Sequence, residues 1–277
     1  MTINCNGKLI DLTTPKVMGI LNVTPNSFYD GGKFTDDKQI LSHVETMLAA
    51  GADFIDVGGY SSKPNVELLS EEEELARVIP VIQKIIKTFP AAIISIDTFR
   101  SEVARQSVEN GAAIINDIAA GSLDENMMKT VAKLKVPYIM MHMKGNPQTM
   151  QSLANYENIV KEMLLYFSEK VALARSFGIN DLIIDPGFGF AKTIEQNFEV
   201  LQKLELFQML QLPLLIGVSR KSMIHKTLGI TADSCLNGTT SLNTIALMKG
   251  AKILRVHDVK EAIECVKLYT KLTAPNS

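Results

Sequence analysis

The stretch "MGILNVTPNSF", residues 18–28, contains the pattern from which the fold can be predicted. It begins as a short apolar run and changes character at Asn22, where Thr24 and Pro25 follow. Proline lacks the N–H that a sheet ladder needs, so a central strand cannot continue through residue 25. The stretch therefore predicts a buried strand that ends in an amide side chain.

The same pattern recurs along the chain and predicts an α/β fold. Further short apolar runs, most of them rich in Ile and Val, lie at 54–57, 93–96, 112–115, 138–141, 182–184, 213–218 and 253–256. Amphipathic stretches lie between them, as at 38–50, 70–88, 155–177, 194–210 and 258–272. Eight buried strands alternating with helices are typical of a (β/α)₈ TIM barrel. A doubly wound open sheet is the alternative, although it needs no eighth strand.

Two local signals refine this prediction. Ser70 stands before four glutamates, which suits a helix N-cap and the positive end of a helix dipole. Asn6-Gly7 lies between two extended runs and predicts a short N-terminal β-hairpin, placed over the barrel floor. No change in composition divides the chain, so we expect one domain over residues 1–277.

Composition excludes several classes of function. Lys and Arg number 28 against 30 Asp and Glu, a net charge of −2 that argues against general nucleic-acid binding. No run approaches the ~20 apolar residues of a membrane span, and Lys8 and Asp11 lie where a signal peptide would be apolar. The three cysteines are far apart and form no CxxC pair, so we expect reduced thiols and a cytoplasmic location.

Polar or charged residues stand at or beside the end of every predicted strand. In this barrel type, sites are built at the carboxyl ends of the strands. The residues there are Asn22; Asp56 with Gly58 and Gly59; Asp97; Asn116 and Asp117; His142; Asp185; Ser219 to Ser222; and Arg255, His257 and Asp258. For Asp117 and Asp258 we expect simple helix capping. Capping alone does not explain Lys221, Arg255 and His257 at the same rim.

The types of side chain at this rim indicate its ligands. Asp97, Asn116 and Asp185 offer acceptors that suit a flat heterocycle rich in N–H donors, whereas Lys221 and Arg255 suit an anion. A helix that begins after "SRKS" would add free N–H groups for an anion. No nucleophile and base pair is evident. His43 and His225 fall in helical stretches and are expected to be ordinary surface or packing residues.

With these residues assembled, the sequence closely resembles the dihydropteroate synthases of the folate pathway. The resemblance covers essentially the whole chain. Its motifs are "GILNVTPNSFYDGG" (19–32), "IDVGGYSSKP" (55–64), "SIDT" (95–98), "IIND" (114–117), "MHMKG" (141–145), "DPGFGF" (185–190), "SRKS" (219–222) and "RVHDV" (255–259).

The resemblance implies a reaction. The family condenses 6-hydroxymethyl-7,8-dihydropterin diphosphate with 4-aminobenzoate, uses Mg²⁺ and releases diphosphate. The diphosphate can depart first and leave a delocalised cation that the neutral aniline attacks, so no catalytic base is needed and the work is mostly electrostatic. The implied catalytic residues are Asp97 for the cation, Lys221, and Arg255 with His257 for the departing anion.

The resemblance also implies which residues bind each group. The pterin is assigned to Asp97, Asn116, Asp185 and Lys221. The diphosphate is assigned to Asn22, Ser62, Lys63, Arg255 and His257, with Asn22 also holding Mg²⁺, which prefers hard oxygen ligands. The 4-aminobenzoate is assigned to Phe28, Ser62, Lys63, Pro64, Phe190 and Ser222. Sulfonamides that mimic 4-aminobenzoate are expected inhibitors, and a homodimer is expected from the family alone.

The chain departs from the family in two loops. The family usually reads GGESTRPG where this chain has "GGYSSKPN", so Tyr60, Ser62, Lys63 and Asn65 replace Glu, Thr, Arg and Gly. Lys63 keeps the charge but loses the planar fork of arginine. Asn26 replaces an aspartate in the first loop. These departures keep a non-catalytic pterin-binding relative open as an alternative. A corrinoid methyltransferase of the same barrel type is the nearest rival, since it would share the pterin contacts, although it has no need of "NVTPxSF" or "SRKS".

Overall fold

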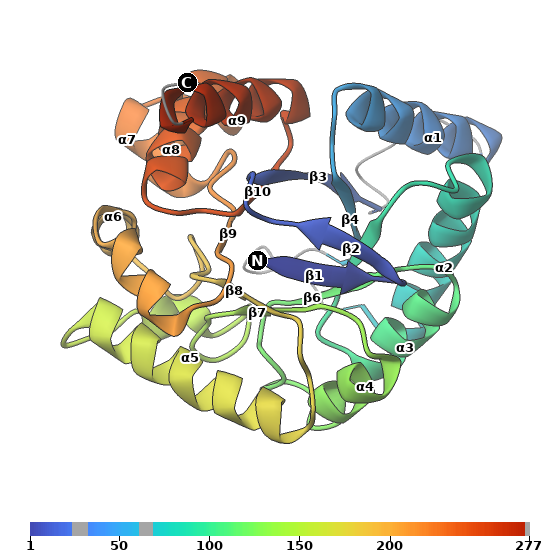
Figure 1. Cartoon of the computed structure of the whole chain (residues 1–277), viewed down its shortest axis with the longest axis horizontal. Helices are drawn as coiled ribbons and strands as arrows, with labels where there is room; N and C mark the ends of the chain where they lie inside the picture. The colour runs from blue at the N-terminus through green and yellow to red at the C-terminus, as the bar shows by residue number, and fades with distance from the viewer. Residues whose placement is uncertain (24–32, 61–68, 275–277) are drawn as a thin grey trace.

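The computed structural model describes residues 1–23, 33–60 and 69–274. Its main sheet has eight parallel strands, and helices surround it (Figure 1). The strands are β3 (Lys16–Asn22), β4 (Phe54–Gly58), β5 (Ile94–Asp97), β6 (Ile114–Asp117), β7 (Tyr138–Met141), β8 (Leu182–Asp185), β9 (Leu215–Ile216) and β10 (Ile253–Val256). Their order in the sheet is β8-β7-β6-β5-β4-β3-β10-β9.

The sheet closes on itself. Leu214, just before β9, forms a parallel bridge with Ile184 of β8, and Ile184 N donates to the carbonyl of Pro213 at 3.0 Å. This closure confirms the (β/α)₈ barrel and excludes the open doubly wound sheet. The run predicted as a strand over 213–218 is wrong in length, because the assigned strand contains only Leu215–Ile216. Pro213 has no N–H to donate to the ladder.

Helices connect the strands on the outside of the barrel. They are α1 (Lys33–Ala49), α2 (Glu71–Thr88), α3 (Ser101–Glu109), α4 (Met127–Leu134), α5 (Ile159–Ser176), α6 (Ile194–Gln202), α7 (Ser222–Leu228), α8 (Leu236–Met248) and α9 (Val259–Thr273). The predicted stretch 194–210 divides after α6 into a 3₁₀ segment, Leu204–Leu210. None of these described helices is long and apolar enough to cross a membrane.

The N-cap of α2 confirms the prediction for Ser70. Glu73 N donates to Ser70 Oγ at 3.1 Å, and Ser70 N donates to Glu73 Oε2 at 3.0 Å. This reciprocal arrangement is a capping box, which satisfies backbone donors that the first helical turn leaves free. It ends the loop after β4 at a defined point.

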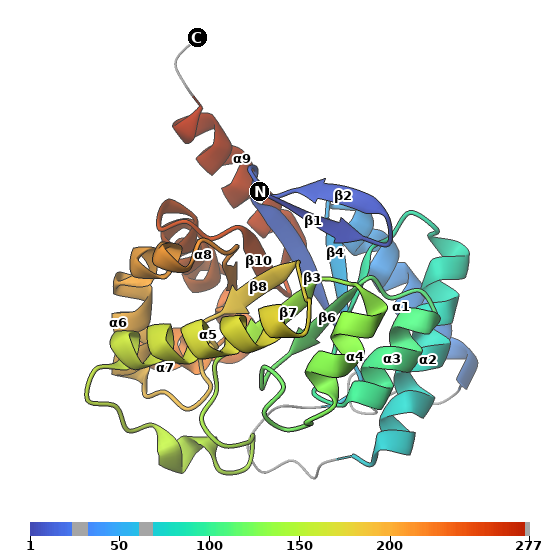
Figure 2. The same cartoon turned by 60° about the horizontal axis from the view of Figure 1, so that its bottom comes forward.

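The N-terminal hairpin closes one end of the barrel, as predicted (Figures 1 and 2). It pairs β1 (Thr2–Cys5) with β2 (Lys8–Asp11), and Asn6 and Gly7 turn the chain with φ of 50° and 84°. Positive φ at both positions matches a type I′ turn. Ile3, Cys5 and Leu12 pack against residues near the amino ends of the barrel strands, such as Phe54 and Ile253. The amino-terminal end of the barrel is therefore closed by packed apolar side chains.

Candidate functional site

A cavity of about 620 Å³ opens at the carboxyl ends of the barrel strands. Its lining combines amides, carboxylates, cations and a few apolar side chains. Among the predicted site residues, the cavity brings together Asn22, Asp97, Asn116, Asp185, Phe190, Lys221, Ser222, Arg255 and His257. These residues come from six strand ends and one helix start, so the barrel topology places them at one rim.

Arg255 links two carboxylates at the base of this cavity. Its Nε donates to Asp56 Oδ2 at 2.6 Å, and its Nη2 donates to Asp97 Oδ2 at 2.6 Å. Asn116 Nδ2 donates to the same Asp56 oxygen at 3.0 Å. Asp56 is fully buried, and its Oδ1 has no hydrogen-bond partner among the described residues. Sequence reasoning noted Asp56 but gave it no role; the structure shows that it anchors Arg255 from below.

The charges in this cluster influence one another. Burial raises the pKa of Asp97, and nearby Asp56 raises it further, while Arg255 opposes both effects. Burial works against the charge of Arg255, but Asp56 and Asp97 raise its pKa above the usual value. Because a guanidinium stays protonated, the cluster keeps a fixed cation between two acidic groups.

Asp185 and Lys221 form the opposite side of the cavity. Asp185 is 7% exposed, and its Oδ1 accepts from Gly187 N at 2.8 Å. Lys221 Nζ donates to the carbonyl of Phe188 at 2.5 Å and lies 4.4 Å from the centre of the Phe190 ring. Burial raises the pKa of Asp185 and lowers the pKa of Lys221 to about 8. Lys221 is thus a cation held at the pocket by one loop.

Lys192 stabilises the loop after β8 from the side away from the cavity. Its role was not predicted from the sequence. It is 4% exposed, and its Nζ lies 3.0 Å from the carbonyls of both Gly187 and Phe190 and 3.1 Å from His142 Nδ1. Burial lowers the pKa of Lys192 to about 7 and that of His142 to about 2. His142 is therefore a neutral packing partner of Lys192, although its strand-end position had suggested the rim.

His257 is also neutral at pH 7. Its Nδ1 lies 3.0 Å from Ser219 Oγ, and burial, followed by Arg220 and Arg255, lowers its pKa to about 4. His257 can therefore act as a neutral hydrogen-bonding group in the cavity wall but not as a cation. Arg220, at a left-handed φ of 57°, bonds Asp258 Oδ1 through Nη2 at 2.6 Å.

The capping roles expected for two aspartates are wrong. Asp258 occupies the N-cap position of α9 but makes no side-chain capping bond, because its carboxylate pairs with Arg220. Asp117 accepts from Ala119 N at 2.8 Å, Gly121 N at 2.7 Å and Tyr138 Oη at 2.6 Å. It organises the turn after β6, since α4 begins only at Met127.

The other predicted contacts lie around the mouth. Asn22 is exposed on the cavity, and Ser222 is the first residue of α7. His225, on the same helix, also lines the cavity. Phe28, Ser62, Lys63 and Pro64 lie outside the described residues.

Tyr60 is the second residue that sequence reasoning missed. It lines the cavity, is 6% exposed, and donates from Oη to Asp97 Oδ1 at 3.0 Å. The sequence had shown it only as a loop residue that differs from the family. A signal was present, because Tyr60 follows directly on the glycine pair at the end of β4 and so stands close to the rim.

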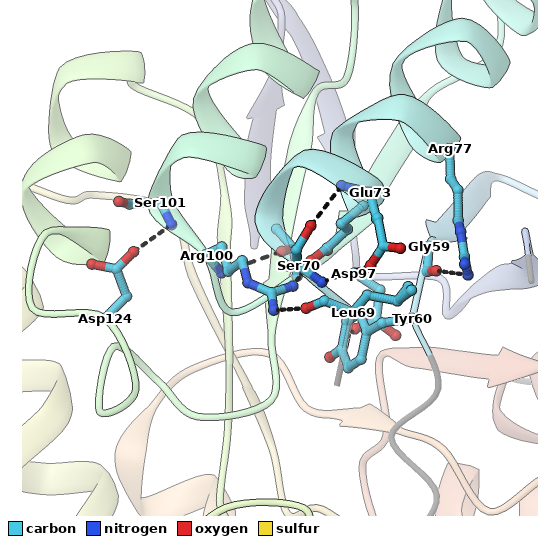
Figure 3. A network of polar contacts seen from close by, with 12 residues as sticks. Gly59, Tyr60, Leu69, Ser70, Glu73, Arg77, Asp97, Arg100, Ser101 and Asp124 are labelled. Carbon is cyan, nitrogen blue, oxygen red and sulfur yellow. Dashed lines mark hydrogen bonds and ion pairs between the residues drawn. The ribbon is translucent and has the colours of Figure 1, made fainter. Parts of the chain in front are cut away.

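Figure 3 shows how the chain is fixed on both sides of residues 61–68. Arg77 Nη1 donates to the carbonyl of Gly59 at 3.3 Å, just before Tyr60. On the other side, Arg100 Nη2 donates to the carbonyl of Leu69, and Nη1 of the same residue pairs with the buried Glu74. These contacts attach the β4 end of the site to helices α2 and α3.

Comparison with known proteins agrees with this geometry. The family model described as "Pterin binding enzyme" matches residues 18–257. The chain is 44% identical to the dihydropteroate synthase of Escherichia coli K12 over 97% of this chain and 95% of that protein. It is 42% identical to the Haemophilus influenzae dihydropteroate synthase over 97% of this chain and 98% of that one.

A solved structure gives the same result. The Yersinia pestis dihydropteroate synthase, solved with a sulfonamide drug complex, superposes with a TM-score of 0.92 at 39% identity, covering 98% of this chain and 99% of that chain. Fold, rim residues and relatives thus agree along nearly the whole length. The chain belongs to the dihydropteroate synthase family of pterin-binding transferases.

Proposed function

We propose that this chain makes 7,8-dihydropteroate from 6-hydroxymethyl-7,8-dihydropterin diphosphate and 4-aminobenzoate, with its rim residues in the following roles. The observation that carries the proposal is the Asp56–Arg255–Asp97 cluster beneath a cavity that also presents Asp185 and Lys221. This cluster supports the proposal because it offers fixed charges of both signs to a bond that ionises to release an anionic leaving group. Charges that need no rearrangement are effective in stabilising a developing ion pair.

The pterin is proposed to occupy the space between Asn116, Asp185 and Lys221. The buried carboxylate of Asp185 can accept two N–H groups from the amino-pyrimidine edge. Lys221 can donate to ring acceptors from the other side. Asp97 then lies where positive charge develops at the pterin as the diphosphate departs.

The diphosphate is proposed to lie toward Asn22, Arg255 and His257, together with Ser62 and Lys63. His257 would contribute as a neutral donor, in keeping with its low pKa. Arg255 is the permanent cation of this group, because its two carboxylate partners keep it charged and oriented.

Asn22 is proposed to hold Mg²⁺ through its amide oxygen. The residues present fit such an ion, since Asn22 is exposed at the cavity and offers a hard amide oxygen there. Mg²⁺ commonly keeps waters and substrate phosphates as its other ligands. When bound, the ion would neutralise charge on the departing diphosphate. Among the described residues, no group of three His, Cys, Asp or Glu side chains competes for it.

The second substrate is proposed to bind between Phe190 and Ser222, with Phe28, Ser62, Lys63 and Pro64. Its carboxylate would meet Ser222 at the start of α7. Sulfonamides of the kind named for the Yersinia pestis structure would compete at this place. The aniline nitrogen would attack as a neutral group, so no general base is required.

A direct assay tests the proposal. The chain is incubated with both substrates and Mg²⁺, and dihydropteroate and diphosphate are measured by mass spectrometry. We expect equal amounts of both products, and none when 4-aminobenzoate is omitted. Pterin binding without product would indicate a non-catalytic relative, and methyl transfer from methyltetrahydrofolate to a corrinoid would indicate the methyltransferase.

We also propose that the protein is a cytoplasmic homodimer. The cysteines Cys5, Cys235 and Cys265 are all buried and free, as expected for a reducing compartment. Helices α8 and α9 expose large apolar side chains, namely Leu236, Ile245, Met248, Leu268 and Leu272. Light scattering during size-exclusion chromatography measures the mass; a monomer at micromolar concentration would contradict the dimer.

A further inference from the structure

Tyr60 occupies a fixed position beside Asp97. Its ring is almost completely buried and meets the Phe99 ring edge-on, with centroids 5.3 Å apart and planes at 84°. Figure 3 shows Tyr60 and Asp97 close together below the start of α2. An edge-to-face contact of this kind orients an aromatic side chain. The ring therefore has little freedom to turn its hydroxyl away.

The backbone before Tyr60 is also constrained. The carbonyl of Gly59 accepts a hydrogen bond from Arg77, and a Cβ at Gly59 would lie 2.6 Å from Val78 Cγ1. The chain thus approaches α2 so closely that only glycine fits there. This close approach directs the side chain of the next residue, Tyr60, toward the cavity.

The two oxygens of Asp97 have different partners. Oδ2 accepts from Arg255 at 2.6 Å, and Oδ1 accepts from Tyr60 Oη at 3.0 Å. Rotation of the carboxylate would break at least one of these bonds. Asp97 is therefore held in one orientation by a cation on one side and a neutral donor on the other, while both Asp97 and Tyr60 line the cavity.

We infer that Tyr60 is a positioning residue for the reaction, which orients the Asp97 carboxylate toward the pterin. The inference rests on the function proposed above and adds a residue to it. In the proposed function, Asp97 is the carboxylate assigned to the developing positive charge. A donor that fixes its direction would act on the chemical step more than on substrate binding.

A phenol is well suited to this task. Burial raises the pKa of Tyr60 well above its ordinary value, so the hydroxyl stays a donor at working pH. The charged and titratable groups near Asp97 include Arg255, Asp56, Glu74, Lys221 and Tyr60. Burial is the main reason why the pKa of Asp97 rises to about 7; Asp56 and Glu74 raise it further, whereas Arg255 and the Tyr60 hydroxyl lower it. An ionised glutamate, the usual family residue here, would accept only.

Tyr60→Phe tests the inference, because it removes one oxygen and keeps the ring. Tyr138→Phe is the control: it removes a Tyr–Asp hydrogen bond that is more deeply buried, from Tyr138 Oη to Asp117 Oδ2, between two residues that do not line the cavity. We expect Tyr60→Phe to lower kcat about tenfold, as for loss of a hydrogen bond to a charged group, with both KM values changed less than about twofold. The acid limb of its pH–rate profile should move to higher pH.

The control should lose thermal stability and keep the wild-type kcat and acid limb. A Tyr60→Phe profile identical to wild type would overturn the inference, as would an equal fall in kcat in both variants. Tyr60→Glu is a second variant that cannot donate once ionised; its acid limb should also lie above that of wild type, and an unmoved limb would count against the inference. Absence of product from the wild-type chain would instead overturn the proposed function.

Discussion

The two ends of the barrel use the same eight strands in opposite ways. At the floor, Ile3 and Leu12 of the hairpin region pack on Phe54 and other apolar side chains. At the mouth, Arg255 contacts both the buried Asp56 and the half-buried Asp97 beside a cavity. Burial stabilises the apolar side chains of the floor. Burial of the charged side chains at the mouth costs desolvation energy, which only well-formed ion pairs and hydrogen bonds offset.

The comparison indicates that the floor of the barrel contributes mainly to stability and the mouth mainly to the chemistry. Apolar burial at the floor depends on area and tolerates small shifts, whereas the charged mouth depends on specific pairs. Changes at the floor should therefore reduce stability without altering the chemistry. Changes at the mouth should alter the chemistry, whether or not they also reduce stability.

The largest effect is expected from Arg255→Met. This change leaves Asp56 and Asp97 without their shared cation, so turnover should fall about a thousandfold, the range found for loss of a preorganised charge. Stability should fall by about 3–5 kcal/mol, the cost of breaking a buried pair. Steady-state kinetics and urea unfolding measure both. Turnover near the wild-type value would remove Arg255 from the catalytic role.

A change at the floor should reduce stability and leave turnover unchanged. Ile3→Ala should lower the free energy of unfolding by about 2–5 kcal/mol, through lost burial and a cavity. The folded fraction should keep its kcat. Leu9→Ala, on the same hairpin but 70% exposed, is the control and should change stability by less than about 0.5 kcal/mol. A selective loss of kcat in Ile3→Ala would contradict the division between floor and mouth.

Asp185→Asn is expected to have an intermediate effect. It replaces one acceptor oxygen by a donor that faces pterin N–H groups, and an unpaired buried polar group costs about 1–3 kcal/mol. Pterin affinity, measured by calorimetry, should fall about tenfold or more. Asp181→Asn is the control just before the same strand, since Asp181 accepts from Asn4 of the floor hairpin. Equal affinities for Asp185→Asn and wild type would place Asp185 outside the pterin site.

The charge of Lys221 predicts a milder pH effect. With a pKa of about 8, its ammonium is present below that pH and is lost above it. The value of kcat/KM for the pterin substrate, which reports on the free enzyme, should therefore decline as pH rises through about 8. Lys221→Met should have a lower kcat/KM throughout and lack this decline. If the variant keeps the same alkaline decline, another group is responsible.

The smallest effect is expected from Lys63→Arg. It restores the usual family residue and its bidentate fork, so turnover should be equal to or slightly above wild type. Arg255→Lys provides the contrast, because it exchanges a fork that bonds two carboxylates for a single ammonium, and should damage turnover. An inactive, folded Lys63→Arg protein would show that this chain's loop depends on its lysine.

The sequence predicted the framework well because its signals are local. The apolar runs and the Asn6-Gly7 turn depend on neighbouring residues, and both are confirmed in β3 to β10 and in the hairpin. Helices between all the strands were expected, but no bounds were predicted for α3, α4 and α8. In α8, the threonines, serine and glycine of Leu236–Met248 weaken the amphipathic pattern that sequence analysis relies on.

What the sequence determined by itself is which residues stand at the rim. Once parallel strands alternate with helices, every strand end faces the same side, so Asn22, Asp97, Asp185 and Arg255 had to meet there. Only the tertiary structure decided which of them touch. Tyr60 reaches Asp97 because Gly59 is pressed against α2, Lys192 is buried because three acceptors surround its ammonium, and Asp258 pairs with Arg220 instead of capping α9. Such contacts join residues from different strands and loops, and their distances follow from packing across the barrel, which spacing along the chain does not encode.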